Sequence, residues 1–205
     1  AIDMIAGPSE ILVVADETAT PAFVAADLLS QAEHDALSSA VLITDSMALA
    51  QQVSAEVERQ LKTLPREAIA RASIETNGKI IVTSDLLCAI DVSNELAPEH
   101  LELCVKEPER YLAYVKNAGS VFLGNDCPES LGDYLAGPNH TLPTSGTARF
   151  SSPLGVDDFV KKTQYTYFSR EALGELADKI AVFARAEGLE AHARAALIRG
   201  AEDDA

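Results

Sequence analysis

The run EILVVAD, residues 10–16, decides the fold class of this chain. It places β-branched and apolar side chains in succession, as is typical of a strand that is buried on both faces. Similar runs follow at residues 39–45 (SAVLITD), 79–85 (KIIVTSD), 100–105 (HLELCV) and 119–124 (GSVFLG). Helical patterns lie between the first four runs, over residues 21–31, 47–64 and 86–96. This alternation predicts an α/β fold with a largely parallel, buried sheet and flanking helices.

The pattern changes after residue 124. A short helix is expected over residues 128–136, and a loop rich in Ser, Thr, Gly and Pro follows its Gly-Pro stop. We place the domain boundary in that loop, between an α/β domain at residues 1–150 and a small region at residues 151–205. This region is expected to hold a strand at QYTYFS (164–169) and then two helices separated by Gly188. It is too short to bury an apolar helix face alone, so it should pack on something else.

The composition limits the possible partners. The chain has 205 residues, is 47% hydrophobic and carries a formal net charge of −16, so a globular core is expected and nucleic acid and membrane-surface partners are not. No apolar run approaches the roughly 20 residues of a membrane span, and the first residues do not resemble a signal peptide. We therefore expect a soluble, cytoplasmic protein.

Two familiar kinds of sequence motif are missing. The cysteines, Cys88, Cys104 and Cys127, are odd in number and far apart, so neither a disulfide framework nor a thiolate zinc site is indicated. The chain also contains no G-x-G pair and hence no glycine fingerprint for a dinucleotide.

The first helix carries two polar residues where apolar ones are expected. Val24, Leu28 and Gln31 are spaced i, i+4, i+7, and His34 follows three residues later. Side chains three apart share one helix face, so Gln31 and His34 could converge on one cation. The alternative is that both merely cap neighbouring backbone groups.

A second unusual pair is Glu99 and His100, at the start of an apolar strand and directly after Pro98. A carboxylate beside an imidazole is a plausible general-base pair. Adjacent strand residues point to opposite faces, however, unless the backbone turns at this point. The alternative is a solvated pair at the beginning of the strand.

The remaining histidines also occupy unusual positions. Asp133 lies inside a short helix, where aspartate is a poor helix former, and His140 follows the Gly-Pro stop. His192 shares an apolar helix face with Ala193 and Ala196, as a core or interface histidine also would. Two histidines, a carboxylate and an amide oxygen nevertheless suit zinc.

Several segments resemble the C-terminal half of the histidinol dehydrogenase family, in the same order and at similar separations. They are AGPSE, DLLSQAEHD, APEHLEL, GSVFLG, GDYLAGPNHTLPTSGTARFSSPLG and EGLEAHARA, and the resemblance runs from residue 1 to about residue 199. It implies an incomplete Rossmann-like domain, followed by a mostly helical dimerisation region that is exchanged with the partner subunit.

The resemblance also implies the site. The zinc ligands would be Gln31, His34, Asp133 and His192, with one zinc per subunit, and Glu99 and His100 would be the catalytic pair. Ser9, His140 and Glu187 match further substrate-binding positions, which join His100 and the four ligands. The implied reaction is the NAD-linked oxidation of L-histidinol through L-histidinal to L-histidine. Glu187 and His192 would be donated across a symmetric homodimer.

The resemblance leaves part of the family's enzyme unaccounted for. Complete members are about twice as long, and their NAD-binding residues lie upstream of the equivalent of Ala1, so this chain looks like a fragment that is inactive alone. Alternatives are a relative that oxidises a sulfonated diol, which Glu187 would disfavour by charge repulsion, or a non-catalytic dimerisation module. A zinc hydrolase is disfavoured because no H-E-x-x-H motif is present.

Overall fold

A five-stranded parallel sheet forms the centre of the first part of the chain. The structure is a computed structural model that describes residues 4–200. The strands are β1 (Glu10–Ala15), β2 (Ser39–Thr44), β3 (Lys79–Val82), β4 (His100–Cys104) and β5 (Ser120–Leu123). Their order in the sheet is β3-β2-β1-β4-β5, and every neighbouring pair is parallel. The predicted α/β fold with a parallel sheet is therefore confirmed.

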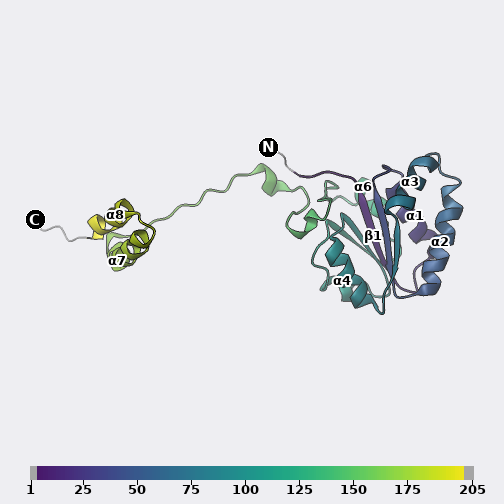
Figure 1. Cartoon of the computed structure of the whole chain (residues 1–205), viewed down its shortest axis with the longest axis horizontal. Coiled ribbons are helices and arrows are strands. Elements are labelled where there is room, and N and C mark those ends of the chain that lie inside the picture. Colours follow the sequence, from purple (N-terminus) through teal and green to yellow (C-terminus); the bar gives the residue numbers. More distant parts are fainter. Residues whose placement is uncertain (1–3, 201–205) are drawn as a thin grey trace, which may run out of the picture. The chain divides into compact units, whose positions relative to one another are not determined.

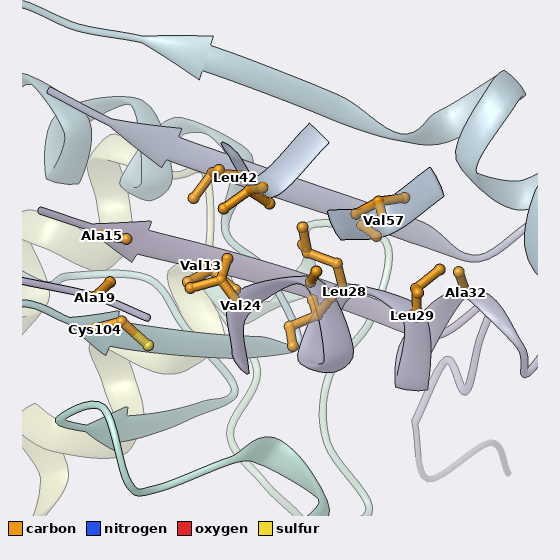
Figure 2. Packing of buried hydrophobic residues seen from close by; sticks show 14 of the residues in the cluster. Val13, Ala15, Ala19, Val24, Leu28, Leu29, Ala32, Leu42, Val57 and Cys104 are labelled. Carbon is orange, nitrogen blue, oxygen red and sulfur yellow. The ribbon is translucent and has the colours of Figure 1, made fainter. Parts of the chain in front are cut away.

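Helices cover both faces of this sheet (Figure 1). One face packs against α1 (Pro21–Ala32), α2 (Met47–Leu61) and α3 (Glu67–Asn77), and the other against α4 (Leu86–Leu96) and α5 (Glu109–Leu112). Figure 2 shows the first of these layers, in which Val13 and Leu42 of the sheet meet Leu28 of α1 and Val57 of α2. Burial on both faces explains why the strands are apolar runs rather than alternating ones.

Three details of the first unit differ from the prediction. The helix expected over residues 47–64 ends at Leu61, and α3 was not predicted; Pro65, which disfavours helical conformation just before it, lies between the two helices. The run at residues 79–85 is not fully buried, because β3 is the edge strand and leaves Ile80 and Val82 partly exposed.

None of the helices within residues 4–200 is long and apolar enough to cross a membrane.

The second compact unit is a pair of helices. Residues mostly contact others on their own side of a boundary between Val160 and Lys161, so the chain forms two compact units. The unit contains α7 (Arg170–Ala186) and α8 (Glu190–Gly200), which pack through Ala181, Ala184 and Ala193. Gly188 makes the turn with a φ of +76°, a left-handed conformation that favours glycine.

The strand predicted at residues 164–169 is wrong. This stretch has no regular secondary structure, and the side chain of Tyr165 is 92% exposed. A strand needs a neighbouring strand to pair its backbone groups. A strand-like sequence such as QYTYFS does not by itself provide that neighbour.

Candidate functional site

The polar residues singled out in the first unit gather at the amino ends of β1 and β4. Because α1 runs back across the parallel sheet, its C-terminal end returns to this edge with Gln31 and His34. The short helix α6 (Glu129–Tyr134) lies beside α1 and brings Asp133. Ligands of open α/β sheets usually bind at the opposite, carboxyl edge, so this site is one that fold class alone would not indicate.

A cluster of metal-binding side chains lies at this edge. One ligand atom each from His34, Glu129 and Asp133 lie within 4.8 Å of one another. Gln31 is only 1% exposed, and its side-chain amide lies against the Glu129 carboxyl group. Turning the amide by 180° would let its nitrogen donate to Glu129 Oε2 at 3.3 Å and its oxygen accept from the Glu10 amide at 3.1 Å. The imidazole of His34 and the carboxylate of Asp133 are ligand types that zinc accepts.

Glu99 and His100 both reach the backbone of Glu10. The Glu99 carboxylate accepts a hydrogen bond from the Glu10 amide at 2.9 Å, and His100 Nδ1 lies 2.9 Å from the Glu10 carbonyl oxygen. His100 Nδ1 and Glu99 Oε2 are 3.6 Å apart. Glu99 lies just outside β4, after a left-handed turn at Ala97, so the alternation of strand side chains does not separate the pair.

The hydrogen bond to Glu10 decides which nitrogen of His100 is basic. A carbonyl oxygen can only accept, so Nδ1 carries the proton and Nε2 keeps its lone pair. Nε2 is buried, has no hydrogen-bond partner among the described residues and lies 3.7 Å from Asp133 Oδ1. Burial lowers the pKa of His100 and raises the pKa of Glu99 to about 7. Near neutral pH the pair therefore offers an unprotonated imidazole and a carboxyl group that can exchange a proton.

A second layer of carboxyl groups supports α6. Glu102 lies on the same face of β4 as His100, is 1% exposed, and accepts a hydrogen bond from the Glu129 amide at 2.7 Å. Burial raises the pKa of Glu102 to about 9, of Glu129 to about 8 and of Asp27 to about 6. Glu102 is consequently neutral at pH 7 and ties the first turn of α6 to the sheet.

Sequence reasoning did not identify this second layer, although two signals were present. Asp27 and Gln31 are spaced i, i+4 on α1, with His34 three residues further, just after the helix ends, and Glu102 is an acidic residue inside an apolar strand. Glu129 gave no such signal, because an acidic residue in the first turn of a helix is ordinary.

The neutral state of Glu102 predicts a pH-dependent stability. The folded protein keeps a proton that the unfolded chain loses above pH 4.5, so the free energy of unfolding should fall as the pH rises towards about 9. Glu102→Gln keeps the acceptor oxygen and removes this titration, so its profile should be flatter. Urea unfolding at several pH values, in the presence of a chelator, measures the free energy of unfolding of the wild type and of Glu102→Gln. Glu75→Gln, at an exposed acid on α3, is the control, and parallel profiles for wild type and Glu102→Gln would contradict the assignment.

A cavity of about 170 Å³ opens beside this group. His100, Asp133 and His140 line it together with Phe122. Gly132 faces the Phe122 ring so closely that a Cβ atom would lie 2.6 Å from it, which explains a glycine inside α6. Ser9 precedes β1, and its carbonyl oxygen accepts from the Ser39 amide at 3.1 Å. The structure thus brings His140 to the cavity and places Ser9 next to Glu10.

Glu187 and His192 belong to the second unit. Glu187 follows the end of α7, His192 lies in the first turn of α8, and both line a hollow of about 370 Å³. Apolar side chains of α7 form much of this hollow, among them Ile180 and Phe183. Phe183 is 75% exposed, so this face of the helix pair is not covered within its own unit.

Comparisons with known proteins agree along the whole chain. The sequence model of the family described as Histidinol dehydrogenase matches residues 1–200. Histidinol dehydrogenase of Bacillus cereus is 60% identical over 203 residues, covering 99% of this chain and 47% of the relative. That of Bacillus subtilis is 62% identical over 193 residues, covering 94% and 45%. The crystal structure of histidinol dehydrogenase from Elizabethkingia anophelis matches with a TM-score of 0.89 and 47% identity, covering 97% of this chain and 46% of that one. The chain thus spans about half the length of these relatives.

Proposed function

The chain belongs to the histidinol dehydrogenase family, and on this premise we propose that it carries the zinc and catalytic residues of an NAD-linked enzyme. The enzyme would oxidise L-histidinol through L-histidinal to L-histidine, and residues outside this chain would bind most of the NAD. One observation carries the proposal: the unpartnered Nε2 of His100 lies 3.7 Å from Asp133, which lies close to His34 at the same edge of the sheet.

Gln31, His34 and Asp133 would hold the zinc, with His192 as the fourth ligand. Their residue types and their proximity support this set. When bound, zinc would orient the substrate through its imidazole and amine groups. Ser9, His140 and Glu187 would make further substrate contacts, and a carboxylate at Glu187 suits a cationic substrate.

His100 would act as the base in the alcohol step. Its Nε2 would take the hydroxyl proton while the hydride passes to NAD, and the Glu10 carbonyl would hold Nδ1–H so that the ring stays oriented. Glu99 would then accept a proton from the water that adds to the aldehyde, before a second hydride leaves. Its pKa of about 7 suits an exchange of this kind at neutral pH.

An assay of the complete protein tests this function. Supplied with L-histidinol and NAD, it should form two equivalents of NADH per histidinol, and elemental analysis should find one zinc per subunit. A sulfonated diol is the comparison substrate. Oxidation of the diol together with no turnover of histidinol would favour the alternative relative and overturn the proposal.

We further propose that the second unit is exchanged between two copies of the chain. Its two helices leave an apolar face around Ile180 and Phe183 uncovered, and a partner subunit could bury this face. Glu187 and His192 line the same hollow, so exchange would complete each site with residues from the partner.

Mixing two inactive variants, His34→Ala and His192→Ala, tests the exchange. A mixed dimer would place both lesions in one site and leave the other intact, so up to about half of the normal activity of that dimer should return. Differently tagged chains that co-purify would show that mixed dimers form. Mixed dimers without activity would mean that His192 acts within its own chain.

A further inference from the structure

The loop after α6, residues 138–146, carries His140 and is tied to the sheet through Glu10. The first half of the loop forms part of the cavity wall, with His140 among the lining residues. In the second half, Ser145 donates its backbone N–H to Glu10 Oε1 at 3.0 Å. Glu10 is the first residue of β1, so this hydrogen bond joins the loop to the central strand of the sheet.

Two anchors hold the second half of this loop. Thr144 Oγ1 donates a hydrogen bond to the Ile5 carbonyl oxygen at 2.9 Å, and the Glu10 carboxylate accepts one from the next residue. Ser145 has a φ of +57°, in the left-handed region, which is unfavourable for a residue other than glycine. The hydrogen bond to Glu10 therefore stabilises the loop at a residue whose backbone conformation is unfavourable.

The main chain and the side chain of Glu10 contact different parts of the site. Its N–H donates to the Glu99 carboxylate, and its carbonyl oxygen accepts from His100 Nδ1. Its side chain instead reaches the loop at Ser145. A substitution of the side chain leaves both main-chain contacts available, so the two functions of this residue can be separated by experiment.

We propose that Glu10 is a positioning residue, whose carboxylate holds Ser145 and thereby fixes the loop so that His140 can contact histidinol from the cavity wall. This inference rests on the proposed function, in which His140 is a substrate contact. In this role the Glu10 side chain acts through His140 and need not touch the substrate. Its loss should consequently weaken substrate binding and leave the base in place.

Steady-state kinetics of the complete enzyme test this role. Glu10→Ala should raise the KM for histidinol by about 10-fold and change kcat by less than about 3-fold, because the main-chain contacts to Glu99 and His100 remain. Glu10→Gln keeps an acceptor oxygen at the same reach, so its KM should return close to that of the wild type. Glu10→Asp keeps the charge but is one methylene group shorter, so it should resemble Glu10→Ala. Glu17→Ala, at an exposed acid beyond the other end of β1, is the control.

A double substitution tests whether Glu10 acts through His140. If it does, adding Glu10→Ala to His140→Ala should raise the KM little further, since the loop no longer carries the contact that Glu10 positions. Two effects that multiply would mean that the Glu10 side chain acts elsewhere, and they would overturn the inference. An unchanged KM in His140→Ala would overturn it as well.

The single variants can also contradict this role. An unchanged KM in Glu10→Ala, a fall in kcat alone, or a Glu10→Gln enzyme as impaired as Glu10→Ala would each do so. In these cases a wild type that oxidises histidinol leaves the proposed function intact, whereas a wild type that does not oxidise it overturns both. Zinc content and urea unfolding show whether each variant folds. If Glu10→Ala does not fold, the comparison of Glu10→Asp with Glu10→Gln decides in the same way.

Discussion

Replacing His100 by asparagine is expected to lower turnover of histidinol by about 10²–10⁴-fold in the complete enzyme. Asparagine can keep a polar contact with the Glu10 carbonyl, but it has no basic nitrogen in place of Nε2. Steady-state NADH formation measures the loss. Zinc content and histidinol binding should stay close to wild type, because His100 lies beside the proposed zinc ligands and is not one of them.

The zinc content of the His100→Asn protein separates two roles. If the substitution removes the metal, His100 is a ligand and not the base. If turnover falls by less than about 10-fold with zinc in place, another group takes the proton. The control should not disturb the fold. Asn94→Ala would do so, because Asn94 Oδ1 accepts hydrogen bonds from the Lys116 and Asn117 amides. Glu75→Gln, on the exposed face of α3, is suitable.

Replacing His34 by alanine is expected to lower zinc occupancy sharply. His34 supplies the imidazole among the proposed zinc ligands of the first unit. The remaining three proposed ligands, Gln31, Asp133 and His192, should bind zinc more weakly than the full set of four. Elemental analysis after dialysis against a weak chelator measures the effect, and Glu33→Ala, at the neighbouring residue, is the control.

An unchanged zinc content in His34→Ala would remove His34 from the metal site. A parallel measurement on His140→Ala would then show whether the histidine on the cavity wall binds the zinc in place of His34.

The sheet and most of its helices could be predicted from local patterns in the sequence. Five apolar runs with helical patterns between them predict a buried parallel sheet, because burial on both faces removes the polar alternation from each strand. The polar residues at the end of the first helix could also be recognised, since Gln31 and His34 follow a regular apolar stripe. These signals are local: each depends on side chains within a few residues of one another.

Which polar groups meet depends on contacts between distant parts of the chain. The register that pairs Ile11 with His100 brings Glu99 and His100 to the two sides of one residue, Glu10, and no local pattern encodes that pairing. Glu129 looks like an ordinary first-turn acid until α6 packs beside the end of α1. The strand predicted at residues 164–169 failed for the same reason, because a strand exists only where another strand pairs with it. Contacts between residues far apart in the chain, and the cost of burying charge without them, lie outside what local periodicity can show.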